Sequence, residues 1–157
     1  MKTLYGGLTF TELAVVVLFF CFSAALSFPK YAVSVEKSRA AEALKIGKDI
    51  KDAQERYYMK NNQYAKDFAD LDIIVGSGRG TAVTQGKFVF NLLPQGYTYI
   101  FPAGGENLNK YWFDYYYSHG ARPGAIACRT YKKRYSKICA SVGGEKDSSV
   151  YEWFINQ

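Results

Sequence analysis

The chain has 157 residues, of which 48% are hydrophobic and 17% aromatic, and its formal net charge at pH 7 is +6. This length allows one domain with one modest core beside a short apolar segment, and it leaves no room within these residues for a second domain. The basic balance attracts polyanions such as DNA or lipopolysaccharide without specifying one, and solubility is the commoner meaning of such a charge.

The first predicted element is an apolar run near the N-terminus. Residues 13–28 are apolar except for two serines. Counted from Leu8, the run has about 21 residues, close to the ~20 that a helix needs to cross a bilayer. We therefore predict a membrane-spanning helix over residues 8–29, preceded by a short segment, residues 1–7.

Glu12 is the one charged residue within this run. A carboxylate costs on the order of 2.5–3.5 kcal/mol at the centre of a membrane helix and less near its end, so its presence indicates a partner. If the chain is cut after Gly7, Leu8 becomes a new amino terminus and Glu12 becomes the fifth residue. In an assembly of such helices, the carboxylate of one could neutralise the α-amine of its neighbour.

This N-terminal pattern resembles that of type IV pilins and pseudopilins, on the basis of Gly7, Glu12, the apolar helix, Pro29 and Tyr31. The resemblance implies that residues 1–7 are a leader, that a membrane prepilin peptidase removes it, and that the new terminus at Leu8 is N-methylated. It also implies that Glu12 and Pro29 belong to the segment that assembles. Leu8 stands where the family usually has Phe. A plain signal anchor with a snorkelling glutamate and a secretory signal peptide stay open as alternatives.

Beyond the apolar run the pattern becomes amphipathic. Apolar residues recur at steps of three and four, the spacing of one helical face, at Ala43, Ile46, Ile50, Ala53 and Tyr57. We predict one helix from Leu8 to Met59 that continues through Pro29, with Asn61-Asn62 as its stop and Gly47 as a weak point. The apolar stripe of its second half needs a cover.

The rest of the chain predicts short strands. A turn signal at 94–96 separates two of them, and the expected strands are 87–93, 97–101, 111–118, 125–129, 138–142 and a last edge strand at 151–155. Residues 76–80 are glycine-rich and are expected to be a loop; they lack the ending of a nucleotide-binding P-loop. The predicted fold class is α+β: a long N-terminal helix, the membrane or filament stalk, packs on a small antiparallel sheet in residues 30–157, as in a type IV pilin.

The three cysteines are expected to behave differently. Cys128 and Cys139 can form a disulfide that closes a loop of about a dozen residues, worth roughly 3 kcal/mol, in an oxidising exterior. A metal pair is the alternative, although only His119 lies nearby as a further ligand. Cys21 lies in the apolar run and should be free. We predict no metal, no cofactor and no enzymatic activity.

The segment between the two cysteines is basic and contains no acid. It holds two tyrosines and five candidates for polyanion binding, namely Arg129, Lys132, Lys133, Arg134 and Lys137. Basic residues neutralise phosphates and aromatic rings stack on bases, so DNA or another polyanion is one predicted partner. The alternatives are a solvated loop, or a loop that pairs with acids of a neighbouring subunit.

Together these features predict a structural subunit of a type IV pilus-like filament. The expected partners are other copies of the chain in a helical homopolymer, the prepilin peptidase, the assembly platform and the inner membrane. A pseudopilin of a type II secretion system, a minor pilin that binds DNA through the basic loop, and a signal-anchored protein are the alternatives. The protein is expected in the inner membrane and then in an extracellular pilus or periplasmic pseudopilus.

The expected orientation involves a conflict. The positive-inside rule places the more basic flank of a membrane helix in the cytoplasm. The flank after the apolar run carries Lys30, Lys37 and Arg39, whereas the flank before it carries little beyond Lys2. The cysteine pair and the family resemblance instead place the globular part within residues 30–157, which we call the head, outside the cytoplasm. We adopt this second orientation.

Overall fold

The computed structural model describes the backbone of residues 9–104, 110–146 and 152–155. Within these ranges it leaves out the side chains of residues 25–30, 32–33, 134, 145–146 and 152–154. The chain forms two units, Met1–Val35 and Glu36–Gln157, and each is described by itself.

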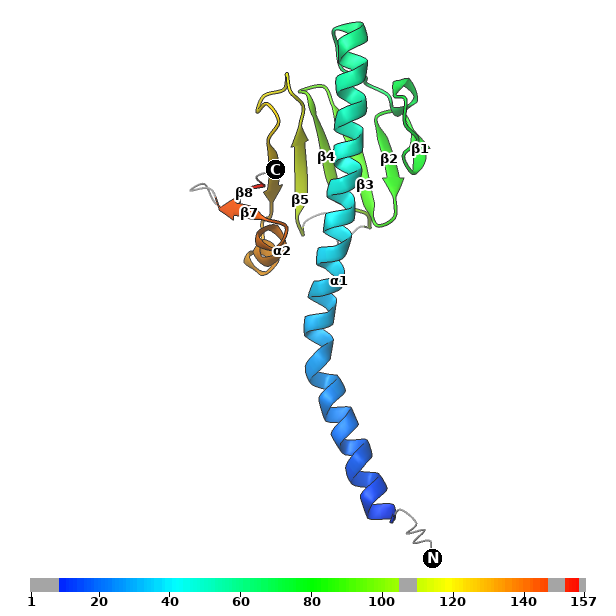
Figure 1. The fold of residues 1–157 in the computed structure, drawn as a ribbon, viewed down its shortest axis with the longest axis vertical. Helices are drawn as coiled ribbons and strands as arrows, with labels where there is room; N and C mark the ends of the chain where they lie inside the picture. The colour runs from blue at the N-terminus through cyan, green and yellow to red at the C-terminus, as the bar shows by residue number, and fades with distance from the viewer. Residues whose placement is uncertain (1–8, 105–109, 147–151, 156–157) are drawn as a thin grey trace, which may run out of the picture. The chain divides into compact units, whose positions relative to one another are not determined.

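Helix α1, Phe10–Asn61, contributes residues to both units (Figure 1). The helix predicted from Leu8 to Met59 corresponds to it, and the backbone is helical at Pro29. The expected stop is confirmed at Asn62, which has a positive φ of 54° and still donates its backbone N–H to the Tyr58 carbonyl at 2.8 Å. Asn is one of the few residues that tolerate this left-handed conformation at the end of a helix.

The second unit contains an eight-stranded antiparallel sheet. The spatial order is β1-β2-β3-β4-β5-β6-β8-β7. The strands are β1 Ser77–Arg79, β2 Ala82–Gln85, β3 Phe88–Leu93, β4 Tyr97–Pro102, β5 Trp112–Tyr116, β6 Ile126–Arg129, β7 Gly144–Lys146 and β8 Glu152–Ile155. The short helices are η1 Phe68–Asp70, η2 Lys133–Tyr135 and α2 Ser136–Ser141. Helices with an antiparallel sheet confirm the predicted α+β class.

Some predicted strands are confirmed and others are wrong. The hairpin around 94–96 is present as β3 and β4. Residues 138–142 lie largely in helix α2, because a short apolar run can be a strand or a helix and its period does not decide between them. The predicted loop at 76–80 contains strand β1. Strand β8 is not the edge, since β7 pairs with its outer side.

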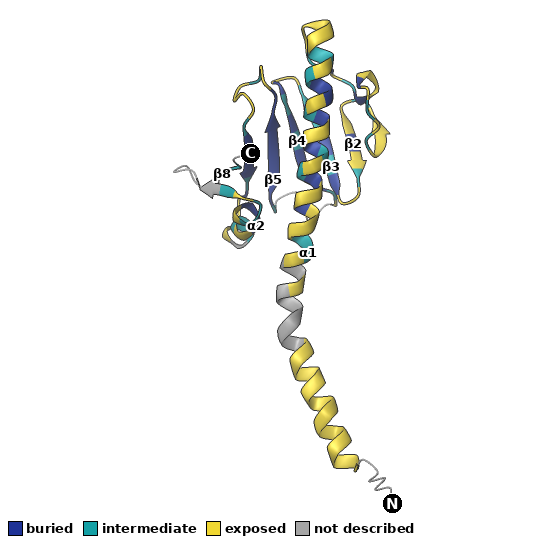
Figure 2. Cartoon of the chain, in the orientation of Figure 1, coloured by how far each residue is buried: buried dark blue, intermediate teal, exposed yellow. Residues whose placement is uncertain are grey.

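The sheet core is made by one face of α1 and one face of the sheet. The predicted stripe is confirmed: Ala43, Ile50 and Ala53 are buried and Ile46 and Tyr57 pack against them. In Figure 2 the buried positions of α1 recur along one side of the helix, and the central strands are dark blue. The sheet residues in the same cluster alternate along their strands; they include Phe90, Ile100, Phe113 and Tyr115. Alternation puts these side chains on the face toward α1 and the intervening ones on the opposite face.

Gly47 has a packing role in addition to its low helix propensity, which was the basis for expecting a weak point of the helix. A Cβ built at Gly47 would lie 2.7 Å from Ile100 Cδ1 and 2.9 Å from Tyr115 Cδ2. Both distances are shorter than carbon–carbon contact, so a side chain here would require Ile100 and Tyr115 to shift. The glycine therefore lets α1 approach strands β4 and β5 closely.

Buried polar groups join α1 to the rest of the head. The Gln54 side chain, fully buried, donates to the Ala65 carbonyl at 3.0 Å and accepts from the Ala65 N–H at 2.8 Å. The Tyr111 hydroxyl donates to Glu36 Oε1 at 2.8 Å, and burial together with this bond raises the pKa of Tyr111. These bonds satisfy groups that would otherwise be costly to bury.

Candidate functional site

The start of α1 is a capping box built from Thr9 and Glu12. The Thr9 backbone N–H donates to Glu12 Oε2 at 2.8 Å, and the Thr9 hydroxyl donates to the same oxygen at 2.7 Å. In return, the Glu12 N–H donates to Thr9 Oγ1 at 3.3 Å. This is the reciprocal pairing of the S/T-x-x-E motif, in which each residue satisfies an orphan donor of the other. The sequence analysis missed it, although Thr9 and Glu12 stand at the right spacing.

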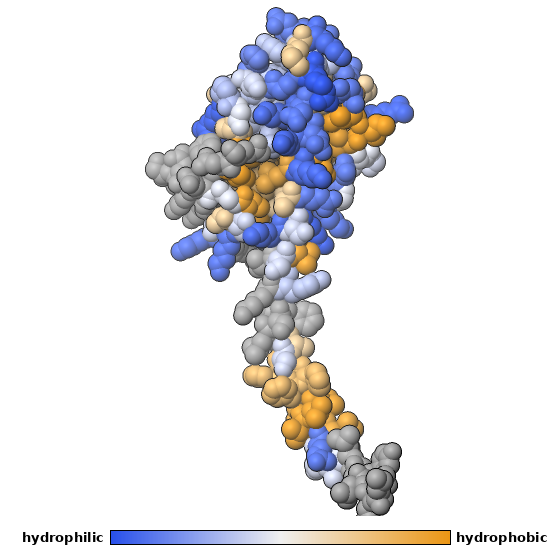
Figure 3. Space-filling model, in the orientation of Figure 1, coloured by the Kyte–Doolittle hydropathy of each residue, from blue (hydrophilic) through white to orange (hydrophobic). Residues whose placement is uncertain are grey.

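Residues 9–24 are all exposed in the isolated chain. The exposed fractions of the large apolar side chains include 85% for Phe10, 69% for Leu18 and 74% for Phe19. In Figure 3 the surface of this segment is mostly orange. Cys21 is free and exposed there, so the prediction that it is unpaired is confirmed.

In the part of the chain that the structure describes, no helix is long and apolar enough to cross a membrane. The predicted span at 8–29 includes residues beyond that part, namely Leu8 and the side chains of 25–29. Gly7 and Leu8, the predicted processing site, lie outside the described residues. Pro29 lies in α1, and its side chain is not described.

The predicted disulfide is confirmed. Cys128 in β6 and Cys139 in α2 are bonded, with their Cα atoms 5.5 Å apart and both residues fully buried. The bond ties helix α2 to the face of the sheet that packs on α1, since both cysteines belong to the main core cluster. Within the described residues, no group of three or more metal-type ligands is present.

The structure separates the five predicted polyanion-binding residues. Lys132, Lys133 and Lys137 are exposed, the last two on η2 and α2. The side chain of Arg134 lies outside the described set. Arg129, at the end of β6, lies on the sheet itself and does not project with the lysines.

Arg129 is held in place by two groups of the neighbouring strand. Its Nη1 lies 2.9 Å from Asp114 Oδ2, and its Nη2 donates to the Tyr116 hydroxyl at 3.3 Å. The Asp114 side chain is only 2% exposed and that of Arg129 is 31% exposed. A buried carboxylate needs such a partner, so Arg129 first neutralises Asp114. The structure thus gives Arg129 an ion-pair partner within the sheet, and its predicted binding of a polyanion stays a prediction.

The sheet face opposite α1 carries six aromatic rings, which we call the aromatic face: Tyr97, Tyr99, Phe101, Trp112, Tyr116 and Tyr131. The register pairs Tyr97 with Tyr116 and Tyr99 with Asp114, which sets these side chains on one face. Ring centroids are 5.0 Å apart for Tyr99–Phe101, 6.3 Å for Tyr99–Trp112 and 4.8 Å for Trp112–Tyr131. Tyr97, Tyr99 and Phe101 alternate with other residues along 97–101, which is the signal in the sequence for the β4 part of this face.

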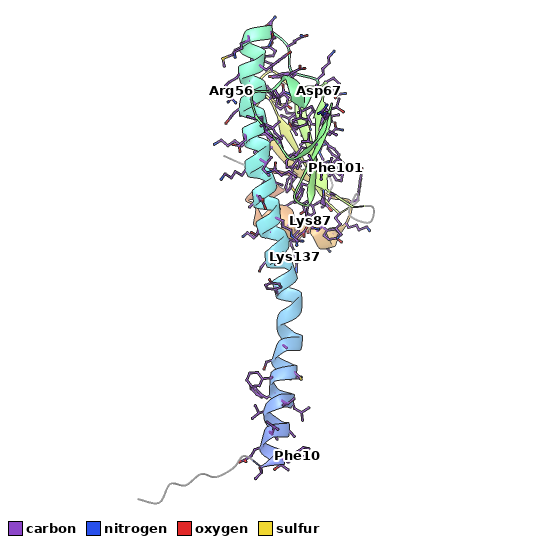
Figure 4. The ribbon with its side chains drawn as sticks, turned by 90° about the vertical axis from the view of Figure 1, so that its right-hand side faces the viewer. Phe10, Arg56, Asp67, Lys87, Phe101 and Lys137 are labelled. Atoms are coloured by element: carbon purple, nitrogen blue, oxygen red, sulfur yellow. A yellow bond between two sulfur atoms is a disulfide. The ribbon has the colours of Figure 1, made fainter. Side chains whose placement is uncertain are left out.

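Among the described residues, no helix or strand packs on the aromatic face. In Figure 4 the sheet is seen from its side, with α1 along one face and Phe101 labelled on the side away from it. Tyr131 is 70% exposed, and Tyr97, Tyr99 and Phe101 are half-buried. Trp112 and Tyr116 are buried beneath these rings. The face thus combines an accessible aromatic layer with an internal ion pair.

Comparison with models of known protein families, with curated proteins and with solved structures finds no match to this chain. The molecule thus offers two candidate functional regions, the start of α1 and the aromatic face of the sheet.

Proposed function

We propose that the chain is a structural subunit of a type IV pilin-like filament, cut after Gly7 and polymerised through its N-terminal helix. Before assembly it is held in the inner membrane with its head outside the cytoplasm. Its partners are further copies of itself, the prepilin peptidase and an assembly platform. A pseudopilin of a secretion system has the same requirements, and the location of the filament, extracellular or periplasmic, distinguishes the two.

The observation that carries this proposal is the exposed apolar helix of residues 10–24. Monomeric soluble proteins rarely expose contiguous apolar surface on this scale, because its transfer out of water is strongly favourable. Lipid satisfies such a surface before assembly, and the helices of other copies satisfy it afterwards. The disulfide between Cys128 and Cys139 supports a head in an oxidising compartment.

Glu12 would then have two roles. Its capping bonds use Oε2, and a carboxylate can accept about four hydrogen bonds. The same side chain can therefore cap its own helix and receive the α-amine of Leu8 from a neighbouring copy. Pairing these two charges offsets the cost of holding either one among apolar helices.

The two roles can be separated by three variants of the full chain, each produced with its peptidase and platform. Glu12→Gln keeps the capping geometry, because glutamine also serves in a capping box, and removes the charge. Glu12→Ala removes both. Thr9→Val keeps the charge and removes the hydroxyl of the cap, which costs about 1 kcal/mol of helix stability. Filament yield is measured by electron microscopy and by shearing, at matched membrane levels.

The proposal expects Glu12→Gln and Glu12→Ala to abolish or sharply reduce filaments, with normal cleavage after Gly7. Thr9→Val should assemble close to wild type. If Glu12→Gln assembles like wild type while the other two variants fail together, Glu12 acts as a cap and charge pairing is wrong. If none of the variants or the wild type is cut or polymerised, the filament function itself is refuted.

A further inference from the structure

We propose that the aromatic face binds single-stranded nucleic acid, with bases stacked on its accessible rings and phosphates held by lysines at one end of the sheet. This inference does not depend on the filament function, since it concerns the opposite face of the head from α1. It also differs from the binding of any polyanion by the basic loop, because it requires the rings of the sheet.

The rings of the aromatic face form a surface on which nucleic acid bases can stack. Phe101, Tyr99, Trp112 and Tyr131 follow one another across β4, β5 and the segment after β6, with neighbouring centroids 4.8–6.3 Å apart. Tyr131 is the most exposed of them and rests on Trp112. Proteins that bind single strands use rings of this kind, because each unpaired base has a flat face that stacks without regard to sequence.

Part of the aromatic face is held by polar and ring contacts within the sheet. Arg129 lies between Asp114 and the Tyr116 hydroxyl, and Tyr116 in turn packs against Tyr97 at 4.9 Å. The rings on β4 and β5 are further fixed by the antiparallel register of those strands. Side chains that are already ordered lose little entropy on binding, which favours affinity.

The buried Thr130 joins two lysine-bearing chain segments beside the aromatic face. The Thr130 hydroxyl donates to the Lys110 carbonyl at 2.6 Å and accepts from the Lys132 N–H at 3.1 Å. This bond pair holds the segment before β5 beside the segment after β6, next to the Trp112–Tyr131 contact. Lys132 and Lys133 are exposed there and Lys110 is partly exposed. Two chain segments thus contribute positive charge where the aromatic layer ends.

The acids on this face are few among the described residues. Asp114 is neutralised by Arg129. The backbone register places Glu152 of β8 opposite Arg129, on the strand that neighbours β6. Among the described side chains next to Tyr131 in the sequence, Lys132 and Lys133 are exposed and positive, which complements a phosphate chain. A neutral oligosaccharide would use the rings without needing these lysines, so a nucleic acid fits the surface better.

The test uses the full chain in non-denaturing detergent and fluorescence anisotropy with a labelled 15-nucleotide oligothymidine. Competitors are a duplex of the same length, polyphosphate of equal charge, and a neutral oligosaccharide. The variants are Tyr131→Ala and Tyr131→Phe, which differ in the ring alone, and Lys132→Gln. Lys48→Gln is the charge-matched control, because Lys48 is exposed on α1 and not on the aromatic face.

We expect the single strand to bind more tightly than the duplex or polyphosphate. Tyr131→Ala should weaken it about 5- to 100-fold and Tyr131→Phe should leave it within about twofold, as stacking predicts. Lys132→Gln should weaken binding and reduce its salt dependence, and Lys48→Gln should not. Thermal unfolding of Tyr131→Ala should match wild type, because the ring is exposed.

Three results overturn the proposal. Equal binding of polyphosphate with no effect of Tyr131→Ala shows a polyanion surface without base stacking. Competition by the neutral oligosaccharide alone assigns the rings to sugars. Self-association that buries Tyr131 and is insensitive to the oligonucleotide assigns the face to a second copy of the chain. None of these results bears on whether the apolar helix forms filaments.

Discussion

The two parts of α1 contrast in how they satisfy their apolar residues. Residues 10–24 are apolar around the whole helix and exposed around the whole helix. From Ala40 to Tyr57, apolar residues occupy one stripe that the sheet covers, and most of the charged residues are exposed. The two parts of one helix therefore differ in what must cover their apolar side chains. A stripe is satisfied within one chain, whereas an apolar cylinder needs lipid or other molecules.

The contrast extends to charge. Glu12 is the one charged residue of the first part, and its described bonds are with Thr9 of the same helix end. In the second part, Arg56 reaches Asp72 and Glu55 accepts from the Ser118 N–H at 2.6 Å. Charges in the second part thus join the helix to the head, while the single charge of the first part remains available to another molecule.

The largest expected effect is on the apolar part and concerns Gly7. Gly7→Val should leave an uncut precursor in the membrane and abolish filaments, because a branched side chain obstructs a peptidase fitted to glycine. The mass of the membrane-extracted protein checks this directly. A normal mature mass in this variant would remove the basis for treating residues 1–7 as a leader. Ser38→Ala is the processing control, because Ser38 is exposed on α1 and far in sequence from Gly7. This variant should be cut normally.

A large effect on the head is expected from its disulfide. Replacing both Cys128 and Cys139 by Ala should lower the free energy of unfolding by about 2–4 kcal/mol, because the unfolded chain regains the freedom that the bond removes. Denaturant unfolding followed by tryptophan fluorescence measures it, since both tryptophans lie in the head. Wild type in a reductant should match the variant, and Cys21→Ala should not change stability.

A smaller effect should come from the contact between α1 and the sheet. Gly47→Ala improves helix propensity by about 1 kcal/mol. The new Cβ, however, meets Ile100 and Tyr115 at distances below 3 Å, and overpacking of this kind costs about 1–3 kcal/mol. We expect a net loss of stability in the same unfolding assay. Ser38→Ala is again the control, and a stabilised Gly47→Ala variant would show that the sheet can move away without cost.

The smallest effect is expected from an exposed ion pair. Arg56 Nε and Nη2 each donate to an Asp72 oxygen at 2.7 Å, and these bonds lower the pKa of Asp72 from its ordinary value of 3.8. Because the folded pKa is depressed, the pair stabilises the head above pH 3.8 and this stabilisation is lost as the pH falls through the lower folded pKa. Asp72→Asn should therefore cause a slight loss of stability at pH 7.

The acid end of the same titration gives the check. At a pH below the folded pKa of Asp72, Asp72→Asn and wild type should have equal stability, because both then lack the carboxylate charge. A difference that persists there would mean that the asparagine changes packing and not the ion pair. High salt at pH 7 should also reduce the difference, because exposed charges are screened.

Some features of this protein follow from the sequence by itself. The period of Ala43, Ile46, Ile50, Ala53 and Tyr57 indicates a buried helical face, and the turn at 94–96 indicates a hairpin; both are local patterns that need no knowledge of distant residues. The disulfide was predictable because two of three cysteines lie near each other outside the apolar run.

Other features were decided only by tertiary structure. Whether residues 138–142 are helix or strand depends on what covers Ile138 and Cys139, and helix α2 buries both. The need for glycine at 47 depends on Ile100 and Tyr115, which are distant in sequence. In the sequence, Arg129 is one of a series of cations. Its ion pair with Asp114 forms only because β5 lies beside β6. The alternation along 97–101 marks one strand of the aromatic face, but the register of β4 with β5 and the contact of Tyr131 with Trp112 join residues that are distant in sequence.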